Sequence, residues 1–117
     1  MDQILRDLNE RAAAKGSLVV TNDGMVVAGS VREELHNEIV GALSSFLISA
    51  TYRCLRQGNV GELTRMVMTA THGKIVIQSL ADYFLVVIAD QFSDTDRAIE
   101  AVRVAGEQLR KMTSIEI

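Results

Sequence analysis

Apolar and polar positions in the first 30 residues predict a helix followed by a β-hairpin. Over residues 2–15 the apolar side chains recur every three or four positions, as on one helical face, and Gly16 stands where a left-handed cap is expected. Two β-branched runs, 17–21 and 25–29, then flank residues 22–24, an Asn-Asp-Gly sequence that tolerates positive φ. We therefore predict a short amphipathic helix and then a hairpin.

A long helix is the next predicted element. Ser30 and Glu33 have the spacing of a capping box, in which the two side chains satisfy backbone N–H groups at the start of a helix. The chain has no proline, and only Gly41 interrupts the pattern before Gly58. The helix is therefore predicted over 33–57, about twice the average length of ~11 to 12 residues.

Three strand-like runs and a final helix complete the pattern. The runs 62–70, 74–80 and 83–89 are separated by short turns, which is typical of a meander. The last run is apolar throughout, so it is predicted to be covered on both faces. Residues 93–96 offer a helix N-cap with acidic side chains, and an apolar helical stripe continues to Met112.

The predicted order of elements is α-β-β-α-β-β-β-α, within a single domain of residues 1–117. This order predicts a layered α/β (α+β) fold with a five-stranded antiparallel sheet. A doubly covered central strand requires helices on both faces of the sheet. We place the long helix on one face and the two terminal helices on the other.

The long helix has more apolar surface than one sheet can cover. Its most apolar face is assigned to the core: Leu35, Ile39, Leu43, Phe46, Leu47, Ala50 and Cys54. A weakly polar flank lies beside that face: Val40, Ser44, Ile48, Thr51 and Leu55. A loop could cover the flank, but we favour the same helix of a second copy, which predicts a homodimer with the flank at its interface.

The first strand of the meander supports the same hypothesis. It is an edge strand unless something pairs with it, and only Glu62 and Arg65 interrupt its apolar pattern. A two-fold axis that pairs the long helices could also pair these strands, which adds Leu63, Arg65 and Val67 to the predicted dimer interface. An ordinary exposed edge is equally compatible with the sequence.

Composition excludes several functional classes. Charged residues make up 23% of the chain and the net charge is -3, so no basic patch for nucleic acid is expected. No apolar run approaches the ~18 residues of a membrane span, and charges occupy the N-terminus where a signal peptide would be apolar, so a cytoplasmic protein is expected. Cys54 is the only cysteine and is interpreted as a small buried hydrophobe.

No catalytic, cofactor-binding or metal-ligating residues are predicted, so we do not expect an enzyme. The sequence has no P-loop, and Ser44 and Ser45 have no histidine within helical reach. His72 is expected to be exposed in a turn. The arginines that could act as arginine fingers are expected to be solvated surface residues: Arg32, Arg53, Arg56 and Arg65.

The element order, the hairpin at 18–28 and the segment 73–90 resemble the roadblock family of dynein light chains and their bacterial and archaeal relatives. The resemblance implies a roadblock/profilin-like fold and a dimer formed through the middle helix and the strand after it. It also implies a regulator or scaffold of a Ras-like small GTPase, with no active site of its own. Polar residues of the long helix would then be available to that partner: Arg32, Asn37, Glu38 and Arg53.

A small-ligand sensor is the alternative, because PAS and profilin-like domains share this architecture. Such a sensor needs a polar-lined pocket. The predicted core positions are instead apolar, and no buried charge is evident among them: Met66, Met68, Ile75, Ile77 and Phe84.

Overall fold

The computed structural model describes residues 1–117 except 22, 24, 32–36 and 116–117. Its elements are α1 (Asp2–Ala12), β1 (Ala14–Thr21), β2 (Val26–Val31), α2 (Asn37–Gly58), β3 (Arg65–Ala70), β4 (Gly73–Leu80), β5 (Tyr83–Asp90) and α3 (Thr95–Ile115). The predicted order of elements is confirmed.

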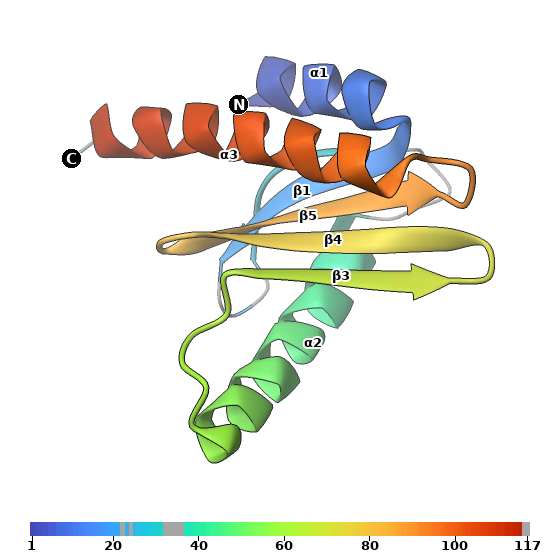
Figure 1. The fold of residues 1–117 in the computed structure, drawn as a ribbon. Coiled ribbons are helices and arrows are strands. Elements are labelled where there is room, and N and C mark those ends of the chain that lie inside the picture. The colour runs from blue at the N-terminus through green and yellow to red at the C-terminus, as the bar shows by residue number, and fades with distance from the viewer. Residues whose placement is uncertain (22, 24, 32–36, 116–117) are drawn as a thin grey trace.

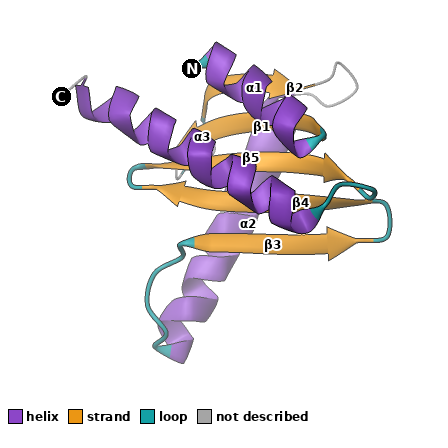
Figure 2. Cartoon of the chain, turned by 45° about the horizontal axis from the view of Figure 1, so that its top comes forward, coloured by secondary structure: helices purple, strands orange, loops and turns teal. Residues whose placement is uncertain are grey.

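The strands form one five-stranded antiparallel sheet in the order β2-β1-β5-β4-β3. The central strand is β5, and its residues Phe84 to Val87 are buried, which confirms a strand covered on both faces. Figure 2 shows α1 and α3 on one face of the sheet and α2 on the other. The predicted layers are therefore confirmed.

Alternation along β5 divides the interior into two cores. Leu85 and Val87 pack with residues of α1 and α3, whereas Phe84 and Val86 pack with Ile48 of α2. This follows from the strand geometry, because successive side chains point to opposite faces of a sheet.

The end of the first helix differs from the prediction. Helix α1 ends at Ala12, and Ala13 adopts the left-handed cap conformation with φ of 52°. Gly16, predicted as the cap, lies instead in β1, where it pairs with Val31 of β2. The cause is non-local: pairing of β1 with β5 begins at Ala14 and takes these residues into the sheet.

Gly16→Ala is expected to destabilise the chain by about 1–3 kcal/mol, because added atoms in a packed interior force backbone shifts. A Cβ at Gly16 would lie 2.5 Å from Cγ1 of Val31 and 2.9 Å from its Cα. Urea unfolding followed by circular dichroism measures the loss. Gly58→Ala is the control, since its Cβ would meet nothing nearer than Cγ1 of Val60 at 3.9 Å. Equal unfolding midpoints for the two variants would contradict this account.

The predicted capping box is not supported at Ser30. This residue lies in β2, pairs with Ser17, and its hydroxyl accepts a hydrogen bond from Nδ2 of Asn9 at 3.3 Å. Residues 32–36, which include the predicted start of the long helix, lie outside the described residues. The described part of α2 begins at Asn37 and ends at Gly58, one residue beyond the prediction.

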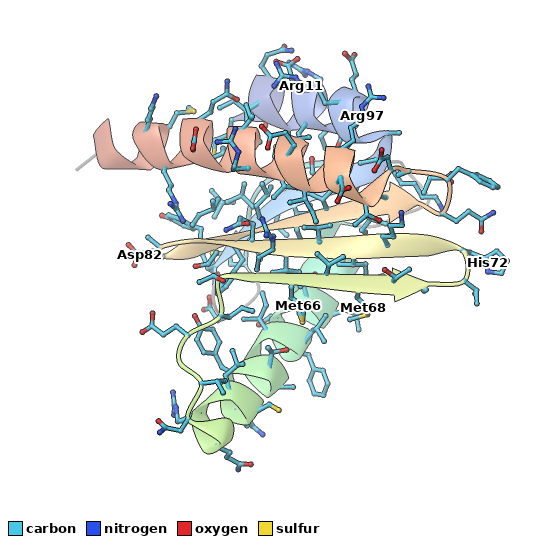
Figure 3. All side chains as sticks on the ribbon, in the orientation of Figure 1. Arg11, Met66, Met68, His72, Asp82 and Arg97 are labelled. Carbon is cyan, nitrogen blue, oxygen red and sulfur yellow. The ribbon has the colours of Figure 1, made fainter. Side chains whose placement is uncertain are left out.

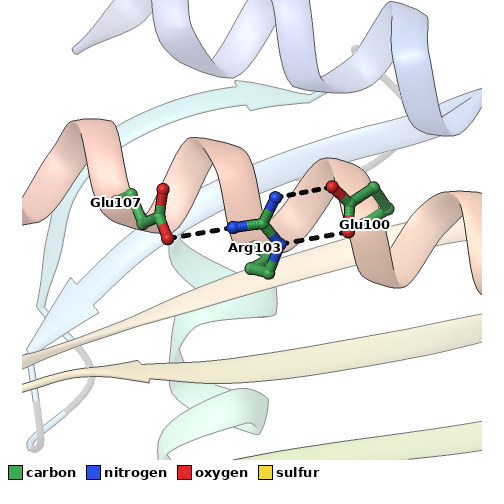
Figure 4. A network of polar contacts seen from close by, with 3 residues as sticks. All are labelled: Glu100, Arg103 and Glu107. Atoms are coloured by element: carbon green, nitrogen blue, oxygen red, sulfur yellow. Dashed lines mark hydrogen bonds and ion pairs between the residues drawn. The ribbon is translucent and has the colours of Figure 1, made fainter.

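Helix α3 has the predicted N-terminal cap and a charged outer face. The carboxylate of Asp94 accepts a hydrogen bond from the backbone N–H of Asp96 at 3.0 Å. Arg103 lies between Glu100 and Glu107, at 2.6 Å and 2.9 Å (Figure 4). The hydrogen bond lowers the pKa of Glu100 and raises that of Arg103. These side chains are exposed, so the pairs contribute little to stability.

Candidate interaction surface

Helix α2 lies on the sheet with the flank that was predicted for the dimer interface, and not with the face that was predicted for the core. Ile48 is only 1% exposed and Ser44 is buried beside it. Ile39, Leu43 and Phe46, predicted for the core, are large apolar residues on the exposed side, with Leu43 66% and Phe46 77% exposed. The prediction of which face contacts the sheet is therefore wrong.

Residue size explains which face packs against the sheet. The sheet face carries Gly41 and Ser44, both buried, together with Ile48. Small side chains let a helix axis come close to its neighbour, whereas Leu43 and Phe46 would hold it farther away. Hydrophobicity alone does not distinguish these two faces, because both are apolar.

The remaining residues predicted for the two faces of this helix are distributed as follows. Val40, Thr51 and Leu55 are half-buried at the margins of the sheet face. Ala50 and Cys54 are exposed, so the prediction of a buried Cys54 is wrong. Leu47 is half-buried, and Leu35 lies outside the described residues. We call the exposed apolar side of α2 the outer face: Ile39, Leu43, Phe46, Ala50 and Cys54.

Strand β3 is an edge strand, as predicted, since among the described strands it pairs with β4 alone. Arg65, Val67 and Met68 are exposed, whereas Leu63 just before the strand is buried in the core beneath α2. Figure 1 shows α2 crossing the sheet and running on past β3. The last turns of α2 therefore extend beyond the edge of their own sheet.

Two neighbouring apolar hollows open on the same face of the sheet as α2. One of about 150 Å³ is lined by Val40, Leu43, Ser44, Leu47, Ile75, Val86 and Ile88. The other, of about 220 Å³, is lined by Lys15, Met68, Ala70, His72, Gly73, Lys74, Ile75, Ile88 and Ala89. They share Ile75 and Ile88, so the apolar floor is continuous. Sequence analysis missed Ile88 because strand residues of this kind are ordinarily assigned to the core.

The predicted partner residues are only partly described. Arg53 is exposed on α2, whereas Arg32 and the side chains of Asn37 and Glu38 lie outside the described residues. Within the described part of the chain, no group of three or more His, Cys, Asp or Glu residues could hold a metal ion. Among the same residues, no helix has the length and apolar character needed to cross a membrane. The outer face of α2 and the neighbouring hollows therefore form an apolar surface with charged side chains at its margin.

Comparison with protein families agrees with the fold. A model described as the Roadblock/LC7 domain matches residues 1–89. The chain belongs to the Roadblock/LC7 family. The resemblance noted in the hairpin and in the segment 73–90 is thereby confirmed, and both regions fall wholly or almost wholly within the match.

This roadblock domain is also similar to individual proteins. An uncharacterised protein of Methanocaldococcus jannaschii is 29% identical over 112 residues, covering 96% of this chain and 98% of that protein. MglB of Myxococcus xanthus has a TM-score of 0.93 at 14% identity, covering 99% of this chain and 89% of that one. Profilin IB of Acanthamoeba castellanii has a TM-score of 0.70 at 10% identity, covering 96% and 98%. These structural likenesses confirm the roadblock/profilin-like fold.

Proposed function

We propose that this roadblock domain is a dimeric protein-interaction module that regulates or scaffolds a Ras-like small GTPase. Membership of the Roadblock/LC7 family supports the proposal, since the roadblock resemblance implies both a dimer and such a partner. The observation that carries it is the apolar character of α2 on opposite sides. A large exposed apolar surface ordinarily marks an interaction site, and the sheet covers only one of the two apolar sides of α2.

A second copy of the chain is the most economical cover. A two-fold axis through β3 would pair the two edge strands antiparallel and lay each overhanging α2 across the hollows of the other subunit. The interface we propose keeps Val40, Thr51, Leu55, Arg65 and Val67 of the sequence prediction. It adds Leu43 and Met68, which are exposed, and omits Ser44, Ile48 and Leu63, which the subunit's own core covers.

The wild-type chain is expected to be a dimer at micromolar concentration. Light scattering coupled to size exclusion should give twice the 12.8 kDa of one chain. Dilution into the nanomolar range separates a permanent dimer from a transient one. The dimer would be contradicted if the measured mass stays that of one chain when the concentration is raised about 100-fold above the micromolar range.

The outermost part of α2 is where we propose that the GTPase binds. Phe46 and Ile39 are exposed on the side of α2 away from the sheet, Arg53 is exposed two turns after Phe46, and we propose that all three stay accessible in the dimer. Exposed aromatic and arginine side chains are enriched at the centres of protein-protein interfaces. Arg32, Asn37 and Glu38 are proposed as further parts of this surface.

Phe46→Ala is expected to weaken GTPase binding at least about tenfold, as truncation of an aromatic hot spot does, while leaving the dimer mass unchanged. Biolayer interferometry against Ras-like GTPases loaded with GDP or a non-hydrolysable GTP analogue measures the affinity. Single-turnover GTP hydrolysis then distinguishes stimulation from scaffolding. Phe92→Ala is the control, because Phe92 is also highly exposed but lies in the turn after β5. Equal losses in both variants would contradict this surface.

A further inference from the structure

The side of β3 turned away from α2 is a second open surface. Figure 3 shows Met66 and Met68 on the α2 side of β3, and Oγ1 of Thr51 on α2 donates to Sδ of Met66 at 3.6 Å. Because successive strand residues point to opposite faces, Arg65 and Val67 face the side of the sheet that carries α3. Helix α3 packs against β4 and β5, and Figure 2 shows that it leaves β3 uncovered.

A recess of about 160 Å³ lies on this side, between the start of β3 and the second half of α3. Gly106 contributes to its floor. A Cβ at this position would lie 3.2 Å from Cδ2 of Leu80 and 3.9 Å from Cγ of Gln78, so the glycine keeps the floor low. We call this hollow the arginine recess, and its lining consists of Arg65, Gln78, Leu80, Arg103, Gly106, Glu107 and Arg110.

The three guanidinium groups of the arginine recess have different partners. Arg103 is held between two glutamates of α3 (Figure 4). Nη2 of Arg110 donates to the backbone carbonyl of Ser79 at 3.0 Å, which holds this guanidinium group at the end of β4. Arg65 is exposed and has no ion pair within the described part of the chain. Even with both glutamates counted, the recess has a net positive charge, in a chain whose net charge is -3.

These groups suit a carboxylate that belongs to a protein. A guanidinium group binds a carboxylate through two parallel N–H···O bonds, and such charge-assisted bonds are strong. Val67 is 37% exposed on the same side of β3 and offers an apolar contact that a free phosphate ion has no group to use. The glutamates of α3 at the margin oppose a nucleic acid, because its phosphates are closely spaced along the strand.

We propose that the arginine recess binds an acidic segment of a partner protein, with a carboxylate on Arg65 and Arg110. The recess is built within one chain, so it does not depend on the proposed dimer. It lies on the opposite side of the sheet from α2, and the domain thereby holds a second partner apart from the GTPase. Pairing of β3 with a second copy would use the edge of the strand and place two recesses on the same face of the joined sheet.

Fluorescence anisotropy of the full chain with a labelled hexaglutamate peptide tests this proposal. Arg65→Gln is expected to weaken binding about tenfold, because it removes charge-assisted hydrogen bonds to a carboxylate. Arg110→Gln should have a similar effect, and it separates the recess from dimerisation because Arg110 lies away from the strand edge. Circular dichroism establishes that the variants fold, and a hexaglutamine peptide is the control for the carboxylates.

Arg97→Gln is the matched control for both variants. It removes the same charge from an exposed arginine of the same helix. Thirteen residue steps separate Arg97 from Arg110, which is about 20 Å at ~1.5 Å per residue. Arg97→Gln should therefore bind hexaglutamate with wild-type affinity.

Heteronuclear NMR locates the bound peptide. The backbone amide of Gly106 and the side-chain amide of Gln78 line the recess, so both signals are expected to shift when hexaglutamate is added. The backbone amide of Gly58 is the internal control, because it lies at the end of α2 on the other side of the sheet and close to Arg56. Its signal should stay unchanged.

Each outcome supports or overturns the proposal. Weaker binding in both recess variants, with Arg97→Gln at wild-type affinity and a shift at Gly106, would support it. Equal losses in all three variants, a shift at Gly58 instead of Gly106, or no binding at millimolar peptide would overturn it. An equal shift at Gly106 with inorganic phosphate or a thymidine hexanucleotide would overturn a protein segment as the occupant. Failure of a GTPase to bind α2 would leave this proposal standing.

Discussion

Ile48→Asp is expected to abolish folding of the chain. Ile48 is 1% exposed and packs in the core between α2 and the sheet with Leu18, Val20 and Phe84. A carboxylate at this position would lie among apolar side chains with no partner, and such burial costs several kcal/mol. That loss is comparable to the entire stability of a typical domain, about 5–15 kcal/mol.

Far-UV circular dichroism and urea unfolding measure this effect. Ile48→Ala provides a graded version that should still fold, with a loss of about 2–5 kcal/mol. Phe46→Asp is the matched control on the same helix, because the side chain it replaces is 77% exposed and its carboxylate would be hydrated. Wild-type stability of Ile48→Asp would contradict the packing of α2, and unfolding of Phe46→Asp would place the core on the other face.

The order and type of the elements were predictable because each depends on a local pattern. The apolar run of β5, the turns of the meander and the Asp94 cap of α3 lie within a few residues of the positions they determine. The end of α1 was not predictable in this way. Ala14 and Lys15 continue a helical pattern, but pairing with β5, some 70 residues away in the sequence, draws them into the sheet.

The orientation of α2 shows a different limit of sequence analysis. Leu43 and Ile48 have almost the same hydrophobicity, so a periodicity argument assigns both to apolar sectors without ranking them. The small residues Gly41 and Ser44 mark the side that approaches the sheet, and that signal is present in the sequence. The excess of apolar surface was identified correctly, although the side that bears it was not.

One part of the candidate site, the edge position of β3, was predictable because it follows from the order of the strands. The first strand of a meander is an edge strand, so the sequence pattern alone identifies β3 as an edge. The larger apolar hollow could not be identified, because Lys15, His72 and Ile88 come from separate strands and turns. Only the sheet register brings them together, and pairing of β3 with a second copy stays a prediction.

Leu43→Asp is expected to give a folded monomer. The side chain of Leu43 is 66% exposed and also lines the hollow beside Ile75 and Ile88, which the second copy is proposed to cover. In the monomer the new carboxylate would be hydrated, so the unfolding free energy should stay within about 1 kcal/mol of wild type. In the dimer two unpaired carboxylates would be buried at the interface.

Sedimentation velocity over a concentration series measures this change, with circular dichroism on the same samples to establish folding. Each substitution occurs twice in a symmetric dimer. The dissociation constant of the dimer should therefore rise at least about 100-fold, equivalent to ~2.7 kcal/mol. Phe92→Asp is the control, since it adds the same charge at an exposed aromatic residue away from α2. If Leu43→Asp stays dimeric with wild-type affinity, α2 does not form the interface, and the apolar outer face must be explained by a partner other than a second copy.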